Sequence, residues 1–225
     1  MNIEKVKNQF DLIAKQYDSH RRCFIPCYDD YYVRSVSILK EYKAKARHIA
    51  DLGAGTGLLT KEIFLLYPEA RFTLIDLSTD MLEIAKKRFS GLNNFEYLAT
   101  DYIENTPADC DIICSALSIH HLENDEKQRI YSNIYKCVPD GGCFITLDQF
   151  CASSQTINDM YNSWWMNYID NSGITSEQKK AWLERKKIDR EISVEDTVSM
   201  LRKAGFSSVE CVYCFMKFAT LVAIK

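Results

Sequence analysis

The chain has 225 residues and 47% of them are hydrophobic, which is enough to fill the core of one domain of ordinary size. Its net charge of −3 gives no general attraction to phosphate backbones and argues against a nucleic-acid partner. The first ten residues lack the apolar core of a signal peptide, and no apolar run approaches the ~18–20 residues needed to span a bilayer, so we expect a cytoplasmic protein with no membrane segment.

The N-terminal region carries two helical patterns. Apolar residues recur at helical spacing over residues 3–17, and a second helix is expected over 29–43. An aromatic, arginine-bearing segment that begins at Tyr17 leads from one to the other. We expect residues 1–45 to form a helical lid over a ligand, with Tyr17 and Tyr28 as flat, hydrogen-bonding walls.

A glycine-rich turn follows the first expected strand, near residues 47–52. Asp51 lies at the end of this strand, and alternate glycines follow at Gly53, Gly55 and Gly57, before an amphipathic helix pattern. A strand, a tight glycine turn and a helix N-terminus together bring bare backbone against a nucleotide-like ligand.

The glycine spacing indicates which ligand this turn holds. A dinucleotide-binding turn would place its third glycine at position 58, which is Leu58 in this chain. With the third glycine at position 57, the turn suits S-adenosyl-L-methionine (SAM) better than NAD, because SAM carries an adenosine but no pyrophosphate. The alternative is that the glycines only shape a turn in a doubly wound protein that binds another ligand.

Two further acids follow expected strands. Asp76 ends the strand expected at 71–76, about twenty residues after Gly57, where a ribose-binding acid belongs. Its carboxylate could accept hydrogen bonds from both ribose hydroxyls. Asp101 follows the strand expected at 94–98 and could accept from the adenine amino group, although an acid in this position is often only a helix cap.

The fourth expected strand covers residues 110–116 and has polar residues at its exit. These residues are Ser115, His120 and His121. One histidine is expected to point into the cleft at the carboxyl end of the strand, where ligands lie in open α/β sheets. The alternative is that both histidines only start a helix or pack against neighbours.

The remaining elements complete a βαβ pattern with one interruption. A fifth strand is expected at 142–149, and the last two strands should meet at a turn near Phe215–Lys217. Helices are expected at 57–66, 78–90, 123–137 and 193–205. Tryptophans and tyrosines in the interrupting segment indicate a helical cap. We expect one domain composed of a lid, a cofactor-binding core, a cap, and a final helix with a strand hairpin: residues 1–45, 46–150, 151–192 and 193–225.

These motifs resemble those of the class I SAM-dependent methyltransferases, the seven-stranded Rossmann-like class. Their first motif matches Asp51 to Gly57, their ribose acid matches Asp76, and their adenine acid matches Asp101. A Pro-Asp-Gly-Gly turn at 139–142 precedes the segment that matches their fifth strand. The resemblance implies an α/β fold with a doubly wound, mostly parallel seven-stranded sheet, an antiparallel last strand and an added helical cap.

The resemblance also implies a set of cofactor-binding residues. They are Tyr28, Asp51, Gly53, Ala54, Gly55, Gly57, Asp76, Leu77, Met81, Asp101, Tyr102 and Ser115.

The nine cysteines do not indicate a metal centre. Cys211 and Cys214 have the spacing of a metal-binding pair, but the alternation of a strand would point them to opposite faces. No second pair at ligand spacing accompanies them. We therefore expect reduced thiols and no metal ligands.

A narrower resemblance is to the carboxy-S-adenosylmethionine synthases, through residues 10–30, 183–185 and 201–225. Those bacterial enzymes turn SAM and prephenate into a carboxylated cofactor used in transfer-RNA wobble-uridine modification. The resemblance implies that Tyr28 contacts the cofactor, and it places the arginine that holds the new carboxylate at Lys180 or a residue near it, shortly before Leu183 and Glu184. This lysine, and Ala116 in place of an asparagine, are departures from that family.

We therefore predict a SAM-dependent methyltransferase that transfers a methyl group to a small-molecule acceptor by in-line displacement. A carboxy-SAM synthase-like enzyme and a transfer-RNA-modifying methyltransferase are the alternatives. His120 or His121 could act as a general base where the acceptor must lose a proton, and Tyr17 is the third catalytic candidate. The aromatic cap is a possible homodimer surface.

Overall fold

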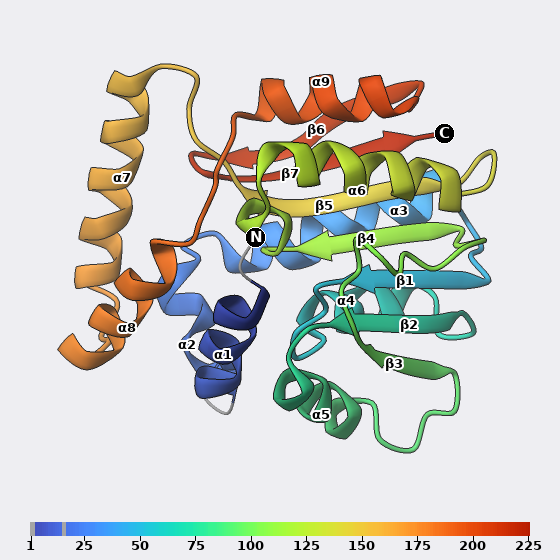
Figure 1. Ribbon diagram of the computed structural model, residues 1–225, viewed down its shortest axis with the longest axis horizontal. Coiled ribbons are helices and arrows are strands. Elements are labelled where there is room, and N and C mark those ends of the chain that lie inside the picture. Colours follow the sequence, from blue (N-terminus) through green and yellow to red (C-terminus); the bar gives the residue numbers. More distant parts are fainter. Residues whose placement is uncertain (1–2, 15–16) are drawn as a thin grey trace.

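Seven strands form one sheet in the order β3-β2-β1-β4-β5-β7-β6 (Figure 1). The first five strands run parallel, and β7 is antiparallel to both β5 and β6. The strands are β1 His48–Leu52, β2 Arg71–Asp76, β3 Phe95–Ala99, β4 Ile112–Ala116, β5 Cys143–Gln149, β6 Ser208–Phe215 and β7 Phe218–Ile224. This arrangement confirms the predicted sheet and its antiparallel last strand.

The computed structural model describes residues 3–14 and 17–225. Residues 1–2 and 15–16 of the expected lid lie outside the described residues. No helix in the described part of the chain combines the length and the apolar character needed to cross a membrane.

Helices cover both faces of the sheet. In β1, Ile49 packs into the hydrophobic cluster on one face, and its neighbour Ala50 packs into the cluster on the other, as strand alternation requires. One face is covered by α3 Ser35–Tyr42, α4 Leu58–Leu66 and α5 Thr79–Arg88, and the other by α6 Asn124–Cys137 and α9 Val194–Ala204. Each fully buried leucine or isoleucine in these clusters stabilises the fold by about 1.5–3 kcal/mol.

Four further helices gather at the carboxyl ends of the parallel strands (Figure 1). They are α1 Ile3–Ile13, α2 Tyr17–Phe24, α7 Gln155–Asp170 and α8 Ser176–Lys186. The N-terminal pair and the cap pair are packed together, because Trp165 of α7 donates its indole N–H to the carbonyl oxygen of Phe24 at 2.7 Å. The Trp182 ring of α8 stacks on the Phe24 ring with centroids 5.5 Å apart. These helices enclose the end of the sheet where ligands bind in α/β folds.

The second N-terminal helix differs from the expected regular helix over 29–43. It begins with one π-helical turn, η2 Asp30–Arg34, before α3. Tyr31 and Tyr32 in this turn are both buried, and their rings meet edge to face at 5.4 Å. The wide turn therefore places two consecutive tyrosines inside the protein.

The expectation that Cys211 and Cys214 point to opposite faces is wrong. The pairing of β6 with β7 shifts register between Cys211 and Tyr213, so Val212 is an extra residue in the strand. This bulge brings the two thiols within hydrogen-bonding reach of each other. All nine cysteines are free thiols, and these two are exposed.

Candidate active site

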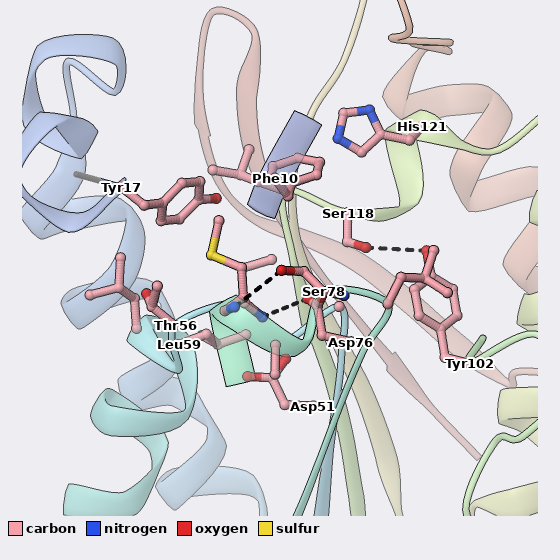
Figure 2. A pocket seen from close by; sticks show the side chains of 18 of the residues that line it. Phe10, Tyr17, Asp51, Thr56, Leu59, Asp76, Ser78, Tyr102, Ser118 and His121 are labelled. Carbon is pink, nitrogen blue, oxygen red and sulfur yellow. Dashed lines mark hydrogen bonds between the residues drawn. The ribbon is translucent and has the colours of Figure 1, made fainter. Parts of the chain in front are cut away.

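A cavity of about 750 Å³ lies at the carboxyl ends of β1, β2 and β4. The chain crosses from β1 to β2 on one side and reaches β4 on the other, so the cavity lies at the point where the strand order reverses. Ligands bind at such switch points in open α/β sheets. In Figure 2, Asp51 and Asp76 form its floor, Phe10 and Tyr17 approach from the N-terminal helices, and Ser118 and His121 face them.

The glycine turn after β1 is held in a conformation that excludes side chains. Gly53 has φ 72° and Gly57, at the start of α4, has φ 79°, which is the left-handed region that favours glycine. A Cβ atom on Gly53 would lie 2.0 Å from the Ser118 Oγ. A Cβ atom on Gly55 would meet no protein atom within 4 Å, so this part of the turn faces open space. At Gly53 and Gly55 the main chain therefore borders the cavity directly, with no side chain between the main chain and a ligand.

Asp51 carries a buried carboxylate oxygen without a partner. Its Oδ2 accepts a hydrogen bond from the Thr60 hydroxyl at 2.6 Å, whereas its Oδ1 has none. Burial raises the pKa of this carboxyl to about 7. An unpaired buried carboxylate oxygen is costly, and a cationic donor such as an ammonium group would satisfy it.

Asp76 is fixed in place by the backbone around it. Its Oδ2 accepts from the Gly55 N–H and its Oδ1 accepts from the Ser78 N–H, both at 2.8 Å. Burial raises the pKa of Asp76 to about 6, against the lowering effect of these hydrogen bonds. The carboxylate lines the cavity and keeps lone pairs for two more donors.

The N-terminal helices are attached to the cofactor-binding core by polar contacts. Asp18 accepts a hydrogen bond from the Thr56 hydroxyl at 2.6 Å and forms an ion pair with Arg88. Asp11 accepts from the Ser78 hydroxyl. These contacts join α1 and α2 to the glycine turn and to the start of α5, so the N-terminal helices form one wall of the cavity.

Most of the residues expected at the site line this cavity. They are Tyr17, Asp51, Gly53, Ala54, Gly55, Asp76, Leu77, Met81, Tyr102 and His121. The lining also contains residues that were not expected there: Lys7, Phe10, Tyr32, Thr56, Leu58, Leu59, Ser78, Ala116, Leu117 and Ser118.

Four expected cofactor contacts lie outside this lining. The Ser115 hydroxyl donates to the Leu52 carbonyl oxygen at 2.7 Å, and Asp101 accepts from the Ile103 N–H at 2.8 Å. The Tyr28 ring stacks on Tyr32, which is the residue that reaches the cavity. The fourth is Gly57, which caps α4.

A second cavity of about 510 Å³ adjoins the first, and we call it the acceptor chamber. Phe10, Tyr17, Leu117 and His121 line both cavities, so the two meet between the lid and the end of β4. The chamber is lined by aromatic rings and cations: Phe24, Trp165, Trp182, Arg21, Arg185 and Lys186.

Two of these cations lack a carboxylate partner. The Arg21 guanidinium lies 4.3 Å from the centre of the Tyr17 ring, and its buried Nε has no hydrogen-bond partner. Within the described residues, neither Arg21 nor Arg185 forms an ion pair with a carboxylate. Lys180 is exposed and is not among the lining residues. The cations of the chamber that lack a carboxylate partner are therefore Arg21 and Arg185, whereas Lys186 is paired with Glu191.

The two histidines differ in environment. His120 lies between two carboxylates: its Nδ1 is 2.5 Å from an Asp148 oxygen and its Nε2 is 3.5 Å from an Asp189 oxygen. Burial alone would lower the pKa of His120, but Asp148 and Asp189 outweigh it and raise the pKa to about 10. Burial and the neighbouring His120 lower the pKa of His121. His121 is thus neutral at pH 7 and faces both cavities, whereas His120 faces only the acceptor chamber.

Comparison with known proteins agrees with this geometry. Residues 49–142 match a family model described as "Methyltransferase domain". This segment, somewhat less than half of the chain, is similar to the class I SAM-dependent methyltransferases. A carboxy-S-adenosyl-L-methionine synthase from Nautilia profundicola is 22% identical over 227 residues, which cover 98% of this chain and 96% of that protein.

Solved methyltransferase structures share the fold. A protein from Nostoc punctiforme assigned as an O-methyltransferase matches with a TM-score of 0.69 and 16% identity over 96% of this chain. Human N-acetylserotonin methyltransferase in complex with SAM matches with a TM-score of 0.59 and 15% identity over all of this chain. This methyltransferase spans only 60% and 56% of the lengths of those two proteins.

The cavity of this methyltransferase fits SAM. The unpaired Asp51 oxygen suits the ammonium group of the methionine part, and Asp76 has lone pairs free for the ribose hydroxyls. The open space at Gly55 leaves room for the adenosine against bare backbone. SAM is the cofactor of the methyltransferases that this chain resembles, and Asp51, Gly55 and Asp76 are the groups that would hold it here.

Proposed function

We propose that this enzyme transfers a methyl group from SAM to a small-molecule acceptor that carries an anionic group. The single observation that supports this most strongly is the acceptor chamber, which opens beside the cofactor cavity and presents two guanidinium groups without carboxylate partners. A planar guanidinium binds a carboxylate or phosphate through two parallel hydrogen bonds. The surrounding rings of Trp165 and Trp182 favour an acceptor with an apolar or aromatic body.

The residues at the junction of the two cavities would exclude water from the reaction. When bound, SAM supplies a methyl group on a positively charged sulfur, which is transferred in line to the acceptor. Phe10 of the lid packs edge to face on His121 at 5.5 Å, and both contribute to each cavity. Removal of water favours a displacement in which charge disappears, and positioning supplies much of the rate.

His121 is the proposed catalytic residue at this junction. Its lowered pKa keeps the imidazole neutral, so it can accept a proton or coordinate a cation at neutral pH. Tyr17 keeps its proton because burial raises the pKa of its hydroxyl, and it serves as a wall and a hydrogen-bond donor. His120 is held by Asp148 and Asp189 and acts on the reaction through its neighbours.

A panel of acceptors tests this proposal. The enzyme is incubated with SAM and matched pairs of compounds, each an aromatic carboxylate or phosphate beside its neutral amide or alcohol. Mass spectrometry then measures S-adenosylhomocysteine and the methylated product. We expect turnover of anionic members only. Equal turnover of the neutral partners would contradict the assignment of the chamber.

Carboxy-SAM synthesis is the second candidate, and the length of the match favours it. The Nautilia profundicola protein named for that activity aligns over nearly the whole of both chains, including the lid and the cap. The chamber that holds Arg21 and Arg185 could bind a dicarboxylate as readily as another anion. Incubation with SAM and prephenate decides between the candidates: a cofactor heavier by one carbon dioxide supports the synthase, and an unchanged cofactor argues against it.

Three finer points are proposals of their own. We propose a cytoplasmic location, because all nine cysteines are free thiols and such thiols persist in a reducing compartment. We propose a homodimer formed through the cap, where Ile157 and Met160 of α7 are exposed. Transfer-RNA binding would require steep salt dependence, and the net charge of −3 argues against it.

A further inference from the structure

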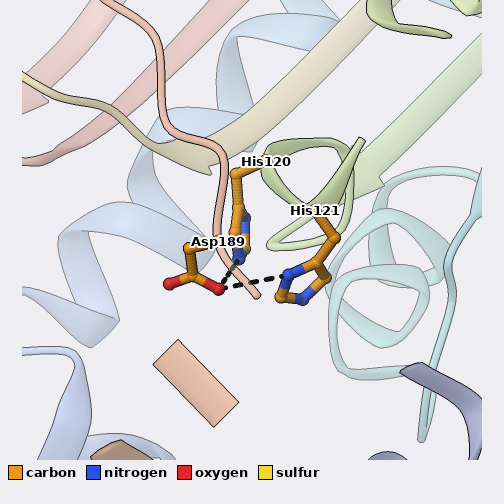
Figure 3. A group of neighbouring side chains, drawn as sticks. All are labelled: His120, His121 and Asp189. Carbon is orange, nitrogen blue, oxygen red and sulfur yellow. Dashed lines mark ion pairs between the residues drawn. The ribbon is translucent and has the colours of Figure 1, made fainter. Parts of the chain in front are cut away.

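We propose that His120, His121 and Asp189 form a binding site for a divalent first-row transition-metal ion, with Zn²⁺ as the ion to test. The three side chains converge from two segments far apart in the sequence, the turn after β4 and the segment after α8 (Figure 3). One donor atom from each lies within 4.8 Å of the others. All three residues line the acceptor chamber. Two histidines and one carboxylate are a donor set suited to such ions.

The spacing of the donor atoms supports the site. The Asp189 Oδ1 lies 3.2 Å from the His121 Nδ1 and 3.5 Å from the His120 Nε2. Ligand atoms bound to one Zn²⁺ at 2.0–2.2 Å in a tetrahedron lie about 3.3 Å apart. The carboxylate is therefore already at ligand spacing from both imidazoles.

His121 and Asp189 lie close together without a well-aligned hydrogen bond between them. The buried His121 Nδ1 has no hydrogen-bond partner, although the carboxylate oxygen lies only 3.2 Å away. His121 is 9% exposed, so water is largely excluded. With the imidazole proton on Nε2, the Nδ1 lone pair would face the carboxylate oxygen, and a cation between the two atoms would satisfy both.

Residues behind the proposed ligands hold them in position. Asp148 contacts the other ring nitrogen of His120 at 2.5 Å, which is the carboxylate–histidine arrangement found behind metal ligands. Gln149 donates to the second oxygen of Asp189 at 2.6 Å. Lys186 lies 3.9 Å from that same second oxygen, so it does not compete with the histidines for Oδ1. The carboxylates of Asp148 and Asp189 together would balance the charge of a dication.

The role of this ion rests on the proposed function, whereas the site itself does not. Three protein ligands leave one tetrahedral position for a group in the acceptor chamber. An acceptor hydroxyl bound there would release its proton to solvent more readily, because a bound cation lowers the pKa of an oxygen ligand. The oxygen would then form its bond to the methyl carbon as the bond from that carbon to sulfur breaks, leaving S-adenosylhomocysteine.

The test is the binding of Zn²⁺ alone to the full chain, measured by calorimetry and by elemental analysis after dialysis. Because exposed thiols are zinc donors and would confuse the measurement, all proteins carry Cys211→Ser and Cys214→Ser. His121→Ala and Asp189→Asn remove ligands, and His20→Ala removes a histidine outside the cluster as the matched control. The absorption spectrum of the Co²⁺-loaded protein reports nitrogen and oxygen coordination.

We expect about one ion per chain, retained in His20→Ala and lost in His121→Ala and Asp189→Asn. Asp148→Asn should keep the ligands and weaken binding by about 10–100-fold. No binding, or binding that the ligand substitutions leave unchanged, overturns the proposal. Circular dichroism checks that each variant is folded, so that a lost ion reports a lost ligand and not an unfolded protein. These readouts need neither SAM nor an acceptor. The metal-site proposal and the methyl-transfer proposal are therefore tested separately, and either can be refuted while the other stands.

Discussion

The Asp51→Asn substitution should have opposite effects on two quantities: it should raise the free energy of unfolding of the SAM-free protein and weaken the binding of SAM. Asp51 is 2% exposed, and burial raises the pKa of its carboxyl from 3.8 to about 7. One pKa unit corresponds to about 1.4 kcal/mol, so keeping this carboxyl ionised at pH 8 costs the folded protein at most about 4 kcal/mol. Asparagine has nearly the same shape and carries no charge. It removes this cost and keeps an oxygen for the Thr60 hydroxyl.

The pH dependence of the effect has a definite sign. The folded carboxyl binds its proton more tightly than the unfolded one, so the ionisation lowers the free energy of unfolding as the pH rises from about 4 to about 7. The amide nitrogen of asparagine would replace the unpartnered Oδ1 and lack an acceptor, which offsets about 1–3 kcal/mol of the gain. We expect a net gain of about 1–3 kcal/mol at pH 8 that shrinks as the pH falls toward 5.

Differential scanning calorimetry of the SAM-free protein measures the gain, which corresponds to a rise in Tm of about 2–10 °C for a chain of this length. Calorimetric titration measures SAM binding, which we expect to weaken by about tenfold or more because the amide cannot pair with the ammonium group. Asp80→Asn, at an exposed acid in the first turn of α5, is the control and should change neither quantity appreciably. A lower Tm at pH 8 together with unaltered SAM affinity would refute the role given to Asp51.

Asp76→Ala should weaken SAM binding by about 10–100-fold through loss of charge-assisted hydrogen bonds, and unchanged affinity in a calorimetric titration would refute the ribose role. Gly53→Ala should abolish SAM binding and lower Tm, because its Cβ would lie 2.0 Å from the Ser118 Oγ; a variant with wild-type affinity would show that the turn is not rigid. Arg185→Ala should raise the KM for an anionic acceptor by about tenfold or more, with little change in SAM affinity. Lys180→Ala, at an exposed lysine outside the chamber, is the control and should leave this KM unchanged. Equal effects of the two substitutions in steady-state assays would contradict the chamber assignment.

The sheet could be predicted from the sequence because its strands are short apolar runs bounded by strong local signals. The run at 71–76 ends at an acid followed by a serine cap, and the cap hydrogen bond from the Met81 N–H to Ser78 is present. The glycine turn is equally local, since its positive φ angles depend on few neighbours. Such features place Asp51 and Asp76 at one edge of a parallel sheet without knowledge of the tertiary contacts.

Residues that depend on tertiary packing were beyond such prediction. The bulge at Val212 reverses the alternation of β6, and nothing in the sequence around Cys211 and Cys214 indicates it. Arg21 and Arg185 meet only because the lid packs on the cap through the indole of Trp165, so alignment alone pointed to Lys180. The convergence of two adjacent histidines with an acid almost seventy residues away carries no local signal either.

Calorimetric titration of the wild-type chain with SAM, beside a parallel titration with NAD, tests the central claim most directly. The account predicts about one SAM site per chain with a Kd below about 1 mM and no binding of NAD, because the carboxylates of Asp51 and Asp76 beside the turn would repel a pyrophosphate. A cavity that binds NAD, or that binds no SAM at millimolar ligand, would contradict it.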